Sequence, residues 1–141
     1  MKYAKRILAL TLIMLPVLAT AQLSSSQKIV AQVPFEFMVA NKHVPAGECS
    51  VQLAIAGGRT LMIRNVAAKV GLFSMANPGE TKKAASAYAL VFHKYGDQYF
   101  LTGIRLAAER TTYVLPQSKA EAEIRAQNVP PTEEILVASL K

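Results

Sequence analysis

The chain has 141 residues, 52% of them apolar, and its 16 Lys and Arg residues against nine Asp and Glu residues give a net charge of +7. This length suits one domain and excludes a multidomain enzyme or a large α/β barrel. A single cysteine excludes an internal disulfide framework and a multi-cysteine metal site, and two histidines exclude a histidine-rich metal cluster.

The amino-terminal segment has the three-part layout of a secretory signal peptide. Three basic residues come first, an uncharged apolar run covers residues 7–15, and small residues precede a cleavage site after Ala21. The apolar stretch, broken by Pro16, is shorter than the ~20 residues that a membrane-spanning helix needs. We therefore predict that residues 1–21 are cleaved on export, to the periplasm or the extracellular space.

Export changes the charge of the mature chain. Removing three of the 16 basic residues leaves 13 against nine acidic ones, a net charge of +4 over residues 22–141. The remaining basic residues are scattered, whereas nucleic-acid binding needs a basic face. We predict no nucleic-acid partner, no transmembrane segment in the mature chain, and a flexible leader over residues 22–28.

The first half of the mature chain contains four segments in which apolar and other residues alternate, the pattern of strands with one buried face. They cover residues 33–39, 49–55, 60–66 and 70–75. Between the first two, Pro45-Ala46-Gly47 predicts a turn.

The next segments predict a loop and a hairpin. Residues 77–83 are polar and contain Pro-Gly, so we expect a surface loop. Residues 87–94 and 99–106 are strand-prone and flank a short Gly-Asp turn, which favours a β-hairpin. Residues 111–115 supply one more short strand.

The pattern then changes to that of a helix over residues 118–127. Ser118 and Glu121 form a capping box, in which each side chain bonds to the other's backbone amide. Arg125 lies four residues after Glu121, the favourable order for an ion pair on a helix. The tail, residues 129–141, is compatible with a strand, a helical turn or a partner contact.

Together these elements predict an all-β fold: an antiparallel sandwich or small barrel of about seven strands with one short C-terminal helix. The domain covers residues 29–128 and is followed by the tail. About 120 residues can bury most of their apolar surface.

Candidate catalytic and metal-binding residues lack supporting patterns. Cys49 occupies an apolar strand position, which favours a buried small side chain over a nucleophile; a disulfide between molecules is the alternative. His43 lies in a turn and His93 in a strand, and neither has metal-ligand spacing to Asp97 or Glu48. Serine-hydrolase and phosphate-loop motifs are absent from the sequence. We predict no catalytic residue, no metal and no cofactor.

Residues 33–48, 90–101 and 115–121 resemble a family of small exported β-rich bacterial proteins, of acidobacterial type, that has no assigned activity. The chain differs from that family at Cys49, where an aromatic residue is typical, and at Arg105, where Trp is frequent. The resemblance implies an exported β-rich domain and no catalytic signature.

The hairpin carries the candidate interaction surface, because five of the ten aromatic residues gather there and tyrosine is favoured at interfaces. Its proposed members are Tyr95, Asp97, Tyr99 and Phe100. We expect a non-catalytic binding or assembly module of the cell envelope or extracellular space, acting on an unidentified protein or on itself. The alternatives are a small barrel that carries an apolar ligand and, least favoured, a hydrolase that uses His93 or Cys49.

Overall fold

The computed structural model describes residues 27–53 and 59–141. The predicted signal peptide, most of the predicted leader and the end of the predicted strand at residues 49–55 lie outside the described residues. β1 begins at Lys28, the last residue of that leader.

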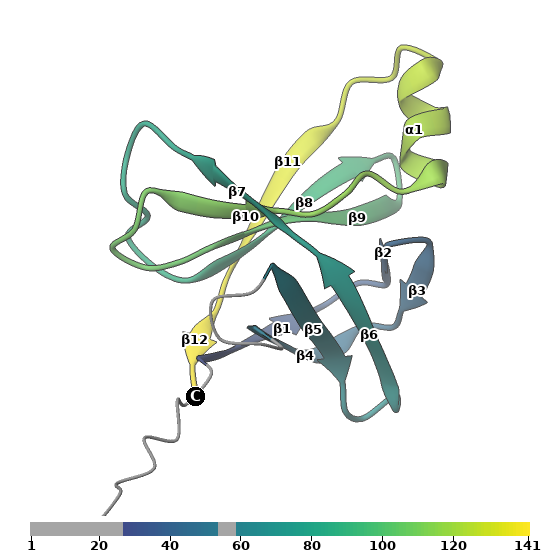
Figure 1. Cartoon of the computed structure of the whole chain (residues 1–141). Helices are drawn as coiled ribbons and strands as arrows, with labels where there is room; N and C mark the ends of the chain where they lie inside the picture. Colours follow the sequence, from purple (N-terminus) through teal and green to yellow (C-terminus); the bar gives the residue numbers. More distant parts are fainter. Residues whose placement is uncertain (1–26, 54–58) are drawn as a thin grey trace, which may run out of the picture.

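Twelve strands and one helix make up the described residues, and the strands form two sheets (Figure 1). The first sheet has the strand order β12-β1-β4-β5-β6. Its members are β1 (Lys28–Val33), β4 (Gly47–Leu53), β5 (Thr60–Asn65), β6 (Val70–Met75) and β12 (Ser139–Leu140).

The second sheet has the order β11-β8-β9-β10-β7, with β2 beside β9 and β3 beside β2. Its members are β2 (Phe37–Val39), β3 (Lys42–Val44), β7 (Asn77–Glu80), β8 (Ala89–Tyr95), β9 (Gln98–Arg105), β10 (Thr111–Val114) and β11 (Thr132–Val137). The pairings within both sheets are antiparallel, except for one parallel contact between β2 and β9. The helix is α1 (Lys119–Ala126).

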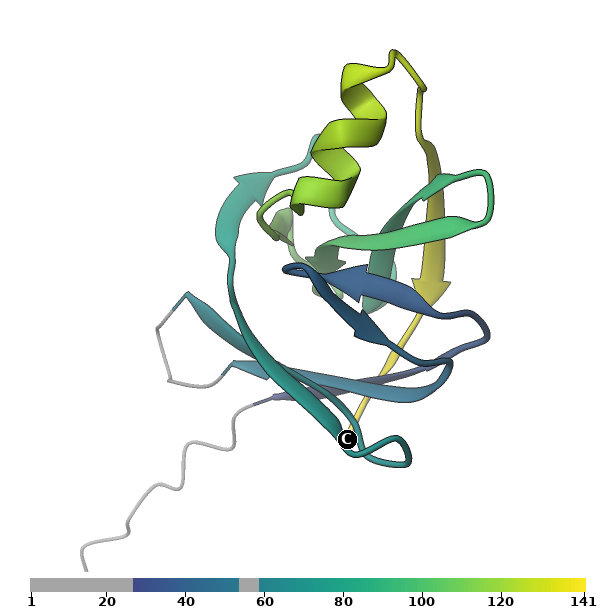
Figure 2. The same cartoon turned by 90° about the vertical axis from the view of Figure 1, so that its right-hand side faces the viewer.

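The core lies between the two sheets (Figure 2). Alternate residues of β5 face it, with Leu61 and Ile63 buried and Arg64 exposed. Phe37 and Phe92 of the second sheet pack edge to face with 5.1 Å between ring centroids. The core members from both sheets form one contiguous cluster, which makes the two sheets a single folding unit.

The structure confirms a mostly β, sandwich-like fold with one short helix. Among the described residues neither sheet closes into a barrel, and there are more strands than the predicted seven or so. The additional strands include β2, β3, β7 and β12, of two to four residues each. Such short strands carry too few residues for an alternating pattern to show in the sequence.

The single strand predicted over residues 33–39 is wrong. The chain leaves the first sheet after Val33 and enters the second at Phe37. Both residues are buried, so the apolar alternation continues although the strand does not. Pro34, which has no backbone N–H to donate to a ladder, stands at the break.

The surface loop predicted over residues 77–83 is also wrong in its first half. Residues Asn77–Glu80 form β7, which pairs with β10 at the edge of the second sheet. An edge strand tolerates Pro78, because one side of it needs no hydrogen bonds. Only the fully buried Ala76 separates β6 from β7, so the chain passes from one sheet to the other almost without interruption (Figure 1).

The predicted hairpin, helix start and late strand are confirmed. β8 and β9 are joined by Gly96 and Asp97, with Gly96 at φ 59°, the positive value that a type II′ turn needs at its first central position. The Ser118 side chain accepts a hydrogen bond from the Glu121 amide at 3.1 Å and caps α1.

The tail takes the strand alternative. β11 pairs with β8 in the second sheet, and β12 pairs with β1 in the first. The C-terminal residues therefore link both sheets.

Candidate interaction site

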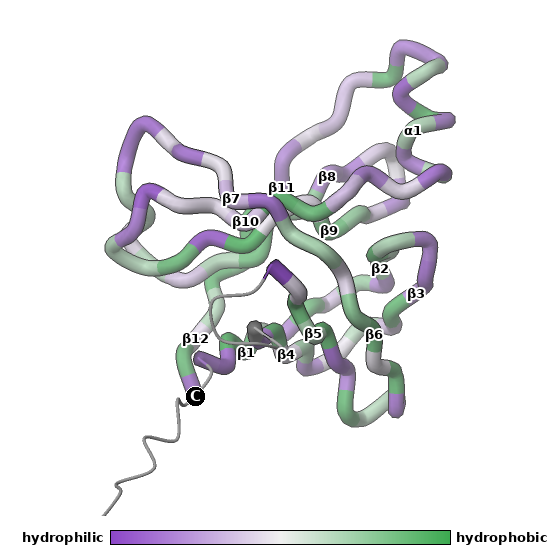
Figure 3. The backbone as a smooth tube through the Cα atoms, viewed as in Figure 1, coloured by the Kyte–Doolittle hydropathy of each residue, from purple (hydrophilic) through white to green (hydrophobic). Residues whose placement is uncertain are grey.

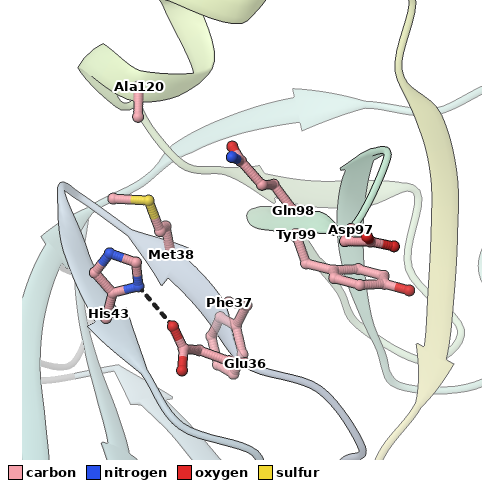
Figure 4. Close-up of a pocket in the computed structure, with 8 residues that line it drawn as sticks. All are labelled: Glu36, Phe37, Met38, His43, Asp97, Gln98, Tyr99 and Ala120. Carbon is pink, nitrogen blue, oxygen red and sulfur yellow. Dashed lines mark hydrogen bonds and ion pairs between the residues drawn. The ribbon is translucent and has the colours of Figure 1, made fainter.

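An open groove lies between the β2–β3 hairpin and the β8–β9 turn (Figure 4). Its volume is about 340 Å³. Glu36 and Met38 lie on one side with His43, and Asp97 and Tyr99 lie on the other, below the first turn of α1. His43 Nδ1 is 2.9 Å from a Glu36 carboxylate oxygen, and both side chains are largely exposed.

The structure divides the predicted interaction surface. Asp97 and Tyr99 line the groove, and the Tyr99 ring stacks on Phe35 with 3.7 Å between centroids. Tyr95 and Phe100 are buried and pack edge to face against each other. The prediction that these last two residues form a surface is therefore wrong. The Tyr95 hydroxyl donates to Glu121 of α1, a residue 26 positions later in the chain.

Glu121 is a buried carboxylate that joins α1 to the second sheet. One of its oxygens lies 2.7 Å from His93 Nδ1 and accepts a hydrogen bond from the Tyr95 hydroxyl at 3.0 Å. Burial, and secondly the hydrogen bond to Glu121, raise the pKa of Tyr95 to about 12.

Among the described residues, the Glu121 carboxylate makes neither of the two contacts that the sequence predicts for it. It makes no hydrogen bond to the Ser118 amide and no ion pair with Arg125. Instead, the carboxylate bonds to the His93 and Tyr95 side chains of the second sheet, because a carboxylate this deeply buried requires close polar partners.

The remaining candidate residues are separated in the structure. Within residues 27–53 and 59–141, no three His, Cys, Asp or Glu side chains gather as a metal site would require. His43 lies in β3 rather than in a turn. Cys49 is 1% exposed, as predicted, and burial raises the pKa of its thiol to about 12. Such a thiol is neither an effective nucleophile nor accessible for a disulfide between molecules.

The sequence did not single out the outer edge of the first sheet, where β6 lies. Phe73 and Met75 of this strand are 65% and 57% exposed, although both are large and apolar. Met62 of β5 lies directly opposite Phe73 and is partly exposed. Figure 3 shows that the tube along β6 is mainly green, the colour of hydrophobic residues.

Among the described residues, no strand pairs with the outer side of the β6 backbone. Ala76 donates to the Arg59 carbonyl at 2.7 Å across the β5–β6 ladder. Because bonded and non-bonded pairs alternate along an antiparallel ladder, Ser74 and Leu72 also bond toward β5. The amides and carbonyls of Gly71, Phe73 and Met75 therefore point away from the sheet.

The other edge strands of the described residues carry the usual protection against pairing with another chain. β12 has two residues, and β3 has three, including a lysine. β11 contains Glu133 and Glu134, and β7 contains Pro78 and Glu80. The six residues of β6 include neither a charge nor a proline. The alternation at residues 70–75 located this strand, but sequence does not show which strand ends a sheet.

Comparison with protein-family models, curated proteins and solved structures finds no match to this chain. No helix of the described residues is long and apolar enough to span a membrane. The protein is thus defined by its class, a mostly β, two-sheet fold with one short helix, and by the open groove and the unprotected edge strand.

Proposed function

We propose that the mature protein is an exported, non-catalytic interaction module of the cell envelope or extracellular space, and that it binds its partner by adding a strand to β6. The observation that carries this proposal is the unprotected edge of β6, whereas the other four edge strands in the described part of the chain are protected. Export rests on the signal-peptide pattern of residues 1–21.

Strand addition suits this edge for two reasons. The outward amides and carbonyls of Gly71, Phe73 and Met75 supply main-chain hydrogen bonds to an incoming strand, the usual source of affinity in this binding mode. The exposed side chains of Phe73 and Met75 add apolar area that the incoming strand covers, at about 25 cal/mol per Å².

The ligand-carrier alternative has less support. A carrier needs an internal cavity of roughly 300 Å³ or more. The hollow between the sheets that is lined by Val51, Leu61 and Ile104 has a volume of about 30 Å³, which is room for water only. These residues belong to the contiguous cluster of buried side chains between the sheets.

The test is a matched pair of substitutions, Phe73→Lys and Val137→Lys. Phe73 and Val137 are 65% and 72% exposed, so either change is compatible with folding, but Val137 lies on the charged edge strand β11. The mature protein and both variants are exposed to the envelope and secreted fractions of the host. Each complex that forms, including complexes between copies, is then examined by amide hydrogen exchange.

We expect Phe73→Lys to weaken binding about tenfold or more, because a lysine would be desolvated against the added strand. Val137→Lys should bind as the native protein does. The amides of Gly71, Phe73 and Met75 should exchange more slowly in the complex. A complex in which these three amides exchange as fast as in the free protein, or no complex in any fraction, overturns the proposal.

A further inference from the structure

We infer that the strand added to β6 is the β6 of a second copy, antiparallel and centred on Phe73. This inference rests on the proposed function, because it names the partner for the same edge. The argument comes from the residue pattern of the strand, its charge and the symmetry of the pairing.

The register centred on Phe73 matches the side chains of the two copies. It sets Phe73 opposite Phe73 and Gly71 opposite Met75, so a residue without a side chain faces a long one. All three have outward backbone groups, so each such pair exchanges hydrogen bonds. Five residues of each copy, 71 to 75, are then paired within the strand.

Neighbouring registers fit less well. Centring on Leu72 sets Met75 opposite Lys69, and centring on Ser74 sets Gly71 opposite Asn77. Centring on Ser74 shortens the paired stretch to residues 73–75, and both registers move Met75 away from the open space beside Gly71.

Apolar contact then continues across the new pair. Met62 lies beside Phe73 in the present sheet, so the row becomes Met62, Phe73 and the same two residues of the second copy. β6 has no charged residue, so two copies approach without like-charge repulsion along the strand. A neutral apolar strand is complemented best by another neutral apolar strand.

Two-fold pairing also closes the assembly. An isologous interface uses the same edge of both copies, so no free β6 edge remains after the dimer forms. The two five-stranded sheets become one continuous sheet. The remaining edges carry the charges, proline or short lengths that oppose further addition.

Register-specific cross-linking tests this inference. Gly71→Cys and Met75→Cys are made separately in the mature chain and mixed, and a thiol cross-linker spanning about 5 Å is added. A side chain fits at Gly71, where a Cβ would lie 3.7 Å from the Arg64 side chain. Cys49 is buried, so the native protein measures the background.

We expect cross-linked dimers in the mixture and few in either variant alone. In the register centred on Phe73, two copies of residue 71 lie about 14 Å apart, four residues at roughly 3.4 Å each. Equal cross-linking in all three samples, or none in any of them, overturns the inference.

Two results separate this inference from the proposed function. If the mature protein sediments as a monomer at every concentration while Phe73→Lys still abolishes binding of a different protein, only the second-copy inference fails. If the three outward amides stay unprotected in every complex, strand addition itself fails, and the inference fails with it.

Discussion

The Glu121 side chain connects α1 to two polar side chains of the second sheet. It is 3% exposed and lies within hydrogen-bond distance of both His93 and Tyr95. Glu121→Gln keeps the length of the side chain but removes its charge. We expect the free energy of unfolding to fall by about 1–3 kcal/mol, as when a hydrogen-bonded charged group is lost.

Urea denaturation measures this change, and Glu123→Gln is the matched control. Glu123 is on the same helix but exposed, so its substitution should change stability by less than about 0.5 kcal/mol. Equal effects of the two substitutions would show that the buried contacts of Glu121 do not hold α1 in place.

The contribution of Tyr95 to stability decreases as the pH becomes strongly alkaline. Burial and the hydrogen bond to Glu121 raise its pKa to about 12, above the ordinary value of about 10. The stability linked to this shift is fully present below pH 10 and is lost as the pH rises through 12. Native protein should therefore lose more stability than Tyr95→Phe between pH 9 and 12, by on the order of 1 kcal/mol.

Denaturation curves of the two proteins at several pH values provide the measurement. The thiol of Cys49 titrates in the same range, with its pKa raised to about 12 by burial, but it is present in both proteins and cancels in the comparison. Parallel stability curves for native protein and Tyr95→Phe would contradict the expected role of the tyrosine.

At the scale of elements, the C-terminal strands are structural parts of both sheets. β11 covers the edge of β8 along six residue pairs, and β12 pairs with β1. Truncation after Asn128 removes both strands and exposes the apolar strand β8. We expect the truncated chain to lose cooperative thermal unfolding, measured by circular dichroism.

The control for this truncation is Val137→Lys, which keeps both strands and should unfold cooperatively. A truncated chain that still unfolds in one sharp transition would show that β11 and β12 are dispensable. Because the truncation disrupts the sheets, it cannot report on an interface in the tail, whereas a single exposed substitution can.

The sequence predicted those elements that depend only on residues close together in the chain. The alternation at residues 60–66 and 70–75, the Gly-Asp turn and the Ser118 cap all depend on neighbours in sequence, and the structure has each of them. The break at Pro34 could not be predicted in this way. Val33 and Phe37 keep the alternation because both sheets bury their residues in the same core.

The candidate site depended on contacts that are distant in sequence. Tyr95 and Phe100 have the composition of an interface, but Glu121, 26 residues after Tyr95, bonds the tyrosine hydroxyl beneath α1. Phe73 has the pattern of an ordinary strand residue, and its exposure follows from the place of β6 at the end of a sheet. Strand order and helix packing are properties of the assembled fold, so periodicity does not encode them.

At the scale of the whole molecule, pairing through β6 links folding to association. Two copies pair only when each is folded, so the dimer stabilises the native state by mass action. The melting temperature of the mature protein should therefore rise with protein concentration, by roughly 2–4 °C for each tenfold increase. Phe73→Lys should melt at one temperature at every concentration, and Val137→Lys should follow the native protein. Scanning calorimetry over a hundredfold concentration range measures these melting temperatures. A native melting temperature that stays constant over that range, or one that rises equally in Phe73→Lys, would mean that β6 does not join two folded copies.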